Sequence, residues 1–453
     1  MSWSRALHRL FPWTDLLLFW LPCLILSGTV YLFLSNGVFV LFVLVNLGVW
    51  IGAIQWQFNN LFFQLKLLYI TVIGIEIFLQ LLAVFHLLPG LNIKHDVPFG
   101  RVYWTKEGDG VNSRMNRFGW YAMESLPEEG KKRIVLIGDS MVEGVQVEKS
   151  EKLDTRLQEV LNTPTSSETQ PVQVFSLGHS GAYPGSYLEY IRHALRYYQP
   201  HEIIVFITVW NDFLNALKVR QSLDYSYIYY DVRSSGELYL LPESKAAIDQ
   251  LHAHLERNRS FAAYLWMEAV RGHLLLPWMV RKVRFLVEQK GGATASFVEE
   301  QKTQPSAQRF EAGGNGFIYE KTLHPDARHA LAINLKLLEE MLALTQSHGV
   351  RLRLVTIPHF PLFFYQEAPD RSWSAEFDDL DLFLPEKHLV TFAQRHKIPL
   401  LPGGQRIQEE GVDKQTIHGW YFRGIGHWTP AGHAQFARML DREWGAVFRS
   451  ENR

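Results

Sequence analysis

Residues 133–144 read Arg-Ile-Val-Leu-Ile-Gly-Asp-Ser-Met-Val-Glu-Gly, an apolar run that ends in Gly138-Asp139-Ser140. Four successive apolar residues that stop at a turn are typical of a buried parallel strand, covered on both faces. In an open α/β sheet, ligands bind at the carboxyl ends of the strands. The run therefore predicts a parallel sheet with Ser140, a candidate nucleophile, at its binding edge. Gly, Asp and Ser also suit an ordinary strand-end turn.

Further apolar runs alternate with helical patterns along the chain. The predicted strands cover residues 134–137, 172–177, 203–209, 350–357 and 398–401. The predicted helices cover residues 151–161, 187–198, 330–347, 386–396 and 431–447. Strands that alternate with helices form a parallel sheet covered on both faces. The expected fold is an α/β domain, built as a three-layer α/β/α sandwich around five parallel strands.

One long segment, at about residues 213–317, interrupts this alternation. It holds four clustered tyrosines between residues 225 and 230 and a polar, glycine-rich tract over 290–316. Long connections inside a compact domain are often lids or binding loops. The insertion is either a lid or substrate groove at the active edge, or a decoration without a role in binding.

The first 90 residues are far more apolar than the rest of the chain. Runs with at most one charge cover residues 16–34, 37–54 and 67–88. Each is close to the length that a helix needs to cross a bilayer core of about 30 Å. The sequence thus predicts a three-helix transmembrane region at 1–90. The alternative is two spans, with the second run inserted only in part.

Positive charges give the expected orientation of these spans. Arg5 and Arg9 precede the first run, and Lys66 lies before the third. Because positive residues favour the cytoplasmic side, we expect a cytoplasmic N-terminus and, after three crossings, a periplasmic or extracellular catalytic domain. Residues 91–132 are then the linker, or lead-in, to that domain at 133–449.

Glu76 lies inside the third predicted span, with Gln80 one turn further on and Asn46 in the preceding span. An ionisable group in the bilayer costs about 2.5–3.5 kcal/mol on insertion scales, so it is expected to face other helices or a partner. Glu76 either belongs to a polar site, for example for a lipid-linked substrate or a membrane protein partner, or hydrogen-bonds within the helix bundle.

Charge and cysteine content narrow the function classes. A formal net charge of -1 provides no overall attraction for nucleic acid, so nucleic acid is not an expected partner. The single cysteine, Cys23, lies in an apolar run and excludes both an intramolecular disulfide and a cysteine-based metal site.

Three more polar blocks follow predicted elements of the sheet. They are Ser176-Leu177-Gly178-His179-Ser180-Gly181, Trp210-Asn211-Asp212, and the Gly426-His427-Trp428-Thr429-Pro430 stretch before the last helix. Together with Gly138-Asp139-Ser140, these blocks resemble in their order the SGNH, or GDSL, hydrolase superfamily. The resemblance covers about residues 130–212 and 320–448, and it implies a flavodoxin-like sheet.

The resemblance assigns a role to each block. Ser140 matches the nucleophile and His427 the general base, while the backbone of Ser140 and Gly181 and the side chain of Asn211 match the donors of the oxyanion hole. A neutral imidazole accepts a hydroxyl proton near pH 7, and the developing oxyanion needs preorganised donors. Asp139 and Asp212 are expected to support the turns that carry these groups. The resemblance implies neither a cofactor nor a metal.

Two features depart from this pattern. Asp326-Ala327-Arg328-His329 has the Asp-x-x-His spacing of the family's acid-base pair, but it precedes the fourth strand, so His427 is the favoured base. Before His427, the positions where the family carries its acid hold Gly424 and Ile425. A backbone carbonyl can orient His427 instead, or a carboxylate can fold back, with candidates Glu409, Glu410 and Asp413. The remaining possibility is a degenerate enzyme.

Two functional hypotheses follow. The first is a membrane-anchored serine esterase or O-acyltransferase that acts on O-acyl groups, as the family suggests on O-acetylated cell-envelope polysaccharide or lipid. The second is a non-catalytic module of the same fold that binds glycan or scaffolds a membrane complex. The missing acid favours the second hypothesis, as does Trp210, which occupies a position where small residues are common in the family.

Overall fold

The structure, a computed structural model, describes residues 71–79, 92–94, 101–104, 107–108, 110–163, 170–216, 228–249, 316–358, 381–422 and 426–450. The spans predicted at 16–34 and 37–54 lie outside the described residues. Of the third, 67–88, only 71–79 are described, and they are helical. Among the residues just given, no helix has both the length and the apolar character that a membrane crossing requires.

Five parallel strands form the central sheet, as predicted. They are β4 (Lys132–Gly138), β5 (Val172–Gly178), β6 (Glu202–Thr208), β9 (Arg351–Ile357) and β10 (Leu400–Pro402). Their order across the sheet is β10-β9-β6-β4-β5. Counted along the chain, this is the order 2-1-3-4-5 of the flavodoxin-like sheets, read from the opposite edge. The α/β fold class predicted from the alternating pattern is therefore confirmed.

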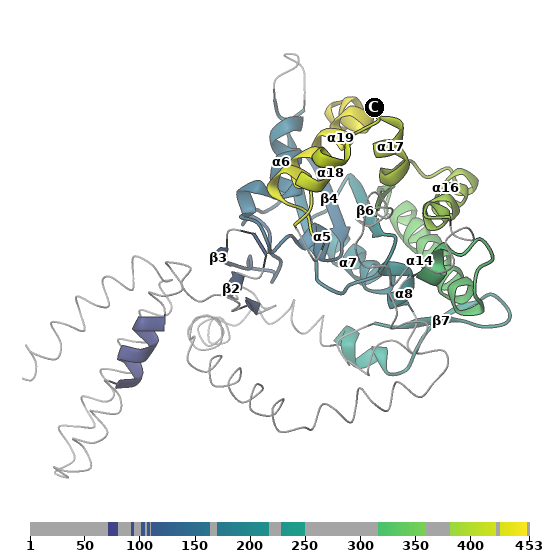
Figure 1. Ribbon diagram of the computed structural model, residues 1–453, viewed down its shortest axis with the longest axis horizontal. Helices are drawn as coiled ribbons and strands as arrows, with labels where there is room; N and C mark the ends of the chain where they lie inside the picture. Colours follow the sequence, from purple (N-terminus) through teal and green to yellow (C-terminus); the bar gives the residue numbers. More distant parts are fainter. Residues whose placement is uncertain are drawn as a thin grey trace, which may run out of the picture.

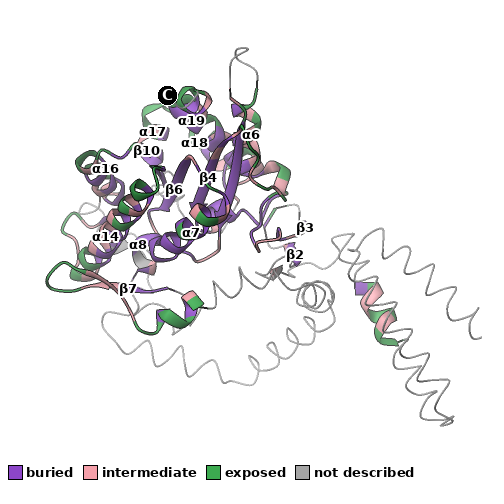
Figure 2. Cartoon of the chain, turned by 180° about the vertical axis from the view of Figure 1, so that it is seen from behind, coloured by how far each residue is buried: buried purple, intermediate pink, exposed green. Residues whose placement is uncertain are grey.

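Helices cover both faces of the central sheet (Figure 1), and successive residues of a strand pack alternately into two cores. Val135 and Ile137 of β4 pack in one core with α7 (Pro184–Tyr197), α14 (Pro325–Ser347) and α16 (Leu384–His396). Ile134 and Leu136 pack in a second core on the opposite face, with α6 (Leu153–Leu161), α17 (Gly403–Glu409), α18 (Lys414–Gly419) and α19 (Pro430–Arg449). Figure 2 shows the strands buried between these layers. A strand buried on both faces explains the unbroken apolar runs in the sequence.

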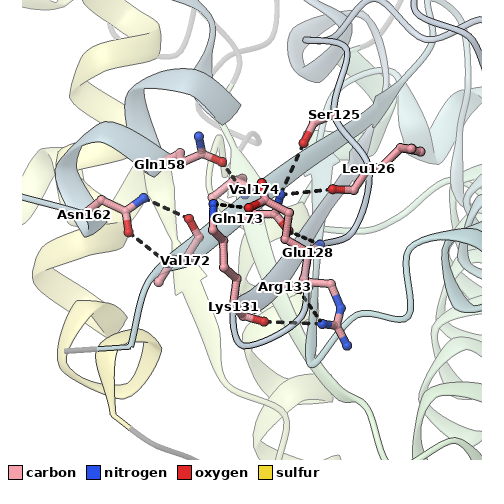
Figure 3. A network of polar contacts seen from close by, with 10 residues as sticks. All are labelled: Ser125, Leu126, Glu128, Lys131, Arg133, Gln158, Asn162, Val172, Gln173 and Val174. Atoms are coloured by element: carbon pink, nitrogen blue, oxygen red, sulfur yellow. Dashed lines mark hydrogen bonds and ion pairs between the residues drawn. The ribbon is translucent and has the colours of Figure 1, made fainter. Parts of the chain in front are cut away.

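The edge strand β5 is protected by side chains rather than by another strand (Figure 3). Asn162, at the end of α6, bonds both the N–H and the C=O of Val172 at 2.8 Å. Gln158 of α6 accepts from the N–H of Val174 at 2.9 Å. These amides occupy backbone groups that would otherwise be open to pairing with another chain.

The segment 91–132, expected to be a linker, contains a small antiparallel sheet of its own. Its strands are β1 (Asn92–Lys94), β2 (Arg101–Trp104) and β3 (Val111–Arg114), in the order β1-β2-β3. We call it the N-terminal sheet. Its buried residues pack with Val145, which lies shortly after β4 in the α/β domain. The N-terminal sheet therefore packs against the α/β domain.

The insertion at 213–317 is described only at 213–216, 228–249 and 316–317. There, β7 (Tyr230–Val232) and β8 (Leu238–Leu240) form an antiparallel pair. This hairpin packs beside α14, where His329 makes an ion pair with Asp231 of β7 at 2.8 Å. The lid or groove predicted for the insertion concerns residues that lie mostly outside the described ones.

Candidate active site

Ser140 lies where β4 meets the one-turn helix α5 (Ser140–Glu143). The turn is tight because Asp139 caps the helix, its carboxylate accepting from the N–H of Met141 at 2.9 Å. Asp139 is fully buried, and burial raises the pKa of its carboxyl group, against the opposing effect of its hydrogen bonds. Ser140 itself is half-buried, so its hydroxyl lies at the surface of the sheet's carboxyl edge.

Asn211 faces Ser140 across the switch point of the sheet. β4 and β6 are neighbours, but the chain leaves β4 toward β5 and leaves β6 toward β9, on the opposite side. Connections that diverge in this way open a crevice, where ligands bind in α/β proteins. The Asn211 side-chain amide donates to Asp139 at 3.0 Å, which joins the ends of the two strands. One of the two amide hydrogens of Asn211 remains for a ligand.

Asp212 stabilises the same turn through hydrogen bonds of its buried side chain. Its carboxylate accepts from the N–H of Thr208 at 2.9 Å and from the hydroxyl of Tyr187, on α7, at 3.0 and 3.1 Å. Asp212 is fully buried, and burial raises the pKa of its carboxyl group well above the usual range. Asp139 and Asp212 thus lie in the turns that they were expected to support.

Gly181 lies in the loop between β5 and α7. Its φ of 78° is in the left-handed region, which glycine adopts without steric cost. The loop is anchored by Glu143, whose carboxylate accepts from the Ser180 N–H at 2.9 Å and from the Ser180 hydroxyl. Among the residues that the structure describes, the N–H groups of Ser140 and Gly181 have no hydrogen-bond acceptor. Both are available to a developing oxyanion.

His427 reaches the site from the other end of the chain. A backbone hydrogen bond of 2.8 Å from the Phe422 N–H to the His427 carbonyl holds the segment, and α19 begins at Pro430. The Nε2 atom of His427 lies 3.0 Å from the Oγ of Ser140, across 287 residues of sequence. This is hydrogen-bond distance, as a nucleophile and its general base require.

The other ring nitrogen of His427 contacts Glu107, between β2 and β3 of the N-terminal sheet. The Nδ1 atom lies 2.9 Å from Oε2 and 3.3 Å from Oε1 of Glu107. The contact to Oε1 has the geometry of a hydrogen bond. Only 2% of the Glu107 side chain is exposed. The contact spans 320 residues of sequence.

Comparison with known proteins finds likeness at the level of structure. No family model and no curated protein matches the chain. Its solved neighbours include a lipase/acylhydrolase from Enterococcus faecalis, with 11% identity over 71% of this chain and 100% of that chain and a TM-score of 0.35.

Two further neighbours are similar to the same extent. TesA has 11% identity over 70% of this chain and 99% of that chain, with a TM-score of 0.34. AlinE4, described as an SGNH-hydrolase family esterase, has 12% identity over 72% of this chain and 100% of that chain, with a TM-score of 0.31. What the site can do follows from its own geometry.

None of the three carboxylates that the sequence offered as partners of His427 lies beside it in the structure. Glu410 binds Arg442 at 2.9 and 3.0 Å, Asp413 caps α18 through the Thr416 N–H at 2.9 Å, and Glu409 is exposed on α17. The proposal that one of these three folds back to His427 is therefore wrong. Gly424 and Ile425 lie outside the described residues. No local pattern pointed to Glu107, because its contact depends on tertiary packing.

Three other histidines have structural partners. His329, the competitor for the base, pairs with Asp231, away from Ser140. His433 is buried in α19, where its Nδ1 accepts from the Leu153 N–H at 3.2 Å, and burial lowers its pKa to about 3. The Nδ1 of His179 lies 2.9 Å from the carbonyl of its neighbour Ser180. The structure thus brings His427 to Ser140.

Proposed function

We propose that this protein is a serine ester hydrolase of the SGNH type, with Ser140 as the nucleophile and His427 as the general base. The observation that carries the proposal is the 3.0 Å contact between His427 Nε2 and Ser140 Oγ at the binding edge of the sheet. The N–H groups of Ser140 and Gly181 and the free amide hydrogen of Asn211 lie around the same edge. They supply the donors that acyl transfer needs.

The first half of the reaction forms an acyl-enzyme. Ser140 Oγ attacks the ester carbonyl carbon while its proton passes to His427 Nε2, and the carbonyl oxygen becomes an oxyanion held by the N–H donors. The intermediate then collapses, and the bond from carbon to the alcohol oxygen breaks. The leaving alcohol takes the proton from Nε2, so that His427 is neutral again.

The second half releases the acyl group. A water molecule gives a proton to His427 Nε2 and attacks the acyl carbon, and collapse returns that proton to Ser140 Oγ with release of the carboxylic acid. A sugar hydroxyl in place of water would complete an O-acyl transfer by the same steps. In either case the ester is cleaved by groups that belong to this chain, without a cofactor.

As the substrate we favour O-acylated, most of all O-acetylated, polysaccharide or lipid of the cell envelope. The support is the apolar composition of residues 1–90, which favours an integral membrane protein with a cytoplasmic N-terminus and a periplasmic or extracellular catalytic domain. The resemblance of the sequence motifs to the SGNH hydrolases suggests O-acylated envelope polymers as the substrate class.

Glu76, which we assigned to a membrane partner or to the bundle, has an electrostatic partner in the chain itself. Burial lowers the pKa of Arg101 in β2 to about 10, and the charge of Glu76 opposes this shift in part.

A covalent probe tests the nucleophile. The full chain is treated with a fluorophosphonate, and its intact mass is measured beside that of Ser140→Ala. We expect one adduct on the wild type and none on the variant. The absence of an adduct on folded wild-type protein, or an adduct that persists in Ser140→Ala, would contradict the mechanism.

Turnover of p-nitrophenyl acetate separates catalysis from binding. The rates of the wild type, Ser140→Ala and His427→Ala are compared, and both variants are expected to lose most of the wild-type rate. Equal rates in all three proteins would instead favour the non-catalytic module that binds glycan.

A further inference from the structure

The tautomer of His427 decides whether it can act as a base. A neutral imidazole carries its one hydrogen on Nδ1 or on Nε2. To accept the Ser140 proton, Nε2 must be bare, and so the hydrogen must lie on Nδ1. The group that faces Nδ1 selects this state if it accepts a hydrogen bond and cannot donate one.

Glu107 meets this requirement. An ionised carboxylate is an acceptor only, and Glu107 places its two oxygens 2.9 and 3.3 Å from Nδ1. The carboxylate is almost fully buried, and its Oε2 has no hydrogen-bond donor among the described residues. Asp139 and His433 also interact electrostatically with His427, from the end of β4 and from α19.

The N-terminal sheet holds Glu107 firmly against the site. Val102 and Tyr103 of β2 and Val111 of β3 are buried on either side of it. The next residue, Gly108, has φ 75°, and a Cβ there would lie 2.8 Å from the Gln146 carbonyl oxygen. Only a glycine fits this close approach. Gly108, next to Glu107, thus lies directly against the segment that follows α5.

A second contact ties the same sheet to the oxyanion loop. Lys94 of β1 makes an ion pair of 2.7 Å with Glu143, whose side chain is only 1% exposed. Glu143 in turn holds Ser180, the residue before Gly181. The N-terminal sheet therefore reaches both sides of the site, through Lys94 and through Glu107.

We propose that Glu107 is the positioning acid of this site, supplied by the N-terminal sheet in place of the aspartate that SGNH enzymes carry just before the catalytic histidine. The inference rests on the proposed function. Glu107 keeps the hydrogen of His427 on Nδ1 and stabilises the imidazolium that forms when Ser140 loses its proton. It does not itself take up that proton.

Three variants of the full chain test the role. Glu107→Gln removes the charge but keeps the shape, and its amide can donate to Nδ1 and so favour the wrong tautomer. We expect kcat for p-nitrophenyl acetate to fall by about 10²- to 10⁴-fold with little change in KM. Glu107→Asp keeps the charge and should recover part of this loss. Glu410→Gln, the same change at an exposed ion pair with Arg442, should leave kcat unchanged.

The pH profile supplies a readout that a purely structural role would not move. Loss of a carboxylate beside Nδ1 disfavours the imidazolium, so the low-pH limb of kcat/KM should move to lower pH in Glu107→Gln and stay in place in Glu107→Asp. A Glu107→Gln enzyme with wild-type kcat and an unmoved limb would overturn the proposal, as would a folded Glu107→Asp enzyme as impaired as Glu107→Gln.

A spectroscopic measurement separates this inference from the proposed function. In ¹⁵N-histidine NMR of the wild type, with His427→Gln to assign the signal, we expect hydrogen on Nδ1 of the neutral ring. Hydrogen on Nε2 overturns the proposal. If Nδ1 carries the hydrogen but no ester is cleaved and no fluorophosphonate adduct forms, the proposed function fails while the positioning by Glu107 stands.

Discussion

The side-chain amide of Asn211 has two hydrogens, one with a structural role and one with a proposed catalytic role. One hydrogen bonds the buried Asp139 at 3.0 Å, and in the proposed mechanism the second donates to the oxyanion. Removing the side chain takes away a donor and leaves a buried carboxyl group without one of its partners. Asn211 is thus the residue at which the two strand ends and the reaction meet.

We predict that Asn211→Ala lowers kcat by about 10²- to 10³-fold, the usual cost of one oxyanion donor. The rate is measured with p-nitrophenyl acetate, and fluorophosphonate labelling checks that Ser140 is still reactive. Asn162→Ala, which changes the same side chain at the edge strand, serves as the control and should retain kcat. An Asn211→Ala enzyme with wild-type kcat would remove Asn211 from the oxyanion hole.

His433 makes the stability of the fold depend on pH. Burial lowers its pKa in the folded protein to about 3, whereas in the unfolded chain it lies near 6.5. The depressed pKa means that this stability is fully present above the unfolded value and is lost as the pH falls toward the folded value. The loss from this one group is up to about 1.4 kcal/mol per pH unit.

The free energy of unfolding, measured by urea titration at pH 7 and at pH 5, tests this linkage. His433→Gln can still accept from the Leu153 N–H but does not titrate. We therefore expect the variant to be less stable than the wild type at pH 7 and to lose less stability on acidification. Equal losses in both proteins would show that His433 does not control the acid response.

At the scale of elements, α5 carries the nucleophile because β5 lets it approach. A Cβ on Gly178, at the end of β5, would lie 2.2 Å from the backbone nitrogen of Glu143 in α5. The helix that begins with Ser140 must then shift away from the sheet. Overpacking of this kind costs about 1–3 kcal/mol of stability.

Gly178→Ala is therefore expected to lower both the thermal midpoint and kcat, since moving α5 displaces the Ser140 hydroxyl from His427. The two effects are measured by calorimetry and by ester turnover. Gly419→Ala, at the end of α18, is a fitting comparison for stability, because a Cβ there meets nothing within 4 Å. Unchanged kcat in a destabilised Gly178→Ala protein would separate the packing of α5 from the chemistry.

Apart from the short strand β10, the elements that the sequence predicted have long, regular patterns. The apolar runs that form β4, β5, β6 and β9 could be recognised in the sequence because both faces of these strands are buried. The strands of the N-terminal sheet have three or four residues each, too short for a period to appear. The short helices α17 and α18 were missed for the same reason.

The residues of the candidate site also differ in whether the sequence predicted them. Ser140, Gly181 and Asn211 each follow a predicted strand, and the carboxyl ends of parallel strands lie at one edge of the sheet. The sequence therefore predicted that these three residues lie close together. His427 was predicted from the order of the motifs along the chain. Glu107 follows no predicted element, and its partner is 320 residues away. A pattern of neighbouring residues carries no information about such a contact, which only the packing of the N-terminal sheet creates.

At the scale of the whole molecule, labelling of a single introduced cysteine tests the proposed orientation of the chain in the membrane. The chain has only Cys23, so Cys23→Ser gives a cysteine-free background. Ser235→Cys then places a thiol in the exposed turn between β7 and β8. We predict that a membrane-impermeant maleimide labels this residue in intact cells, because the positive charges favour a cytoplasmic N-terminus and the three apolar runs predict an odd number of crossings.

Labelling of Ser235→Cys only after lysis would place the domain in the cytoplasm. The cysteine-free protein serves as the blank in both conditions. Fractionation of the same cells tests the anchor, since a chain recovered from the soluble fraction would contradict the integral membrane assignment.

The contact between Glu107, Ser140 and His427 has a consequence for biosynthesis. The three residues leave the ribosome in that order, and the sheet can gather most of its strands before the base exists. A nascent or truncated chain that ends before His427 therefore carries the serine without the imidazole that would activate it. The esterase we propose would stay silent until His427 has been made and has packed beside Ser140.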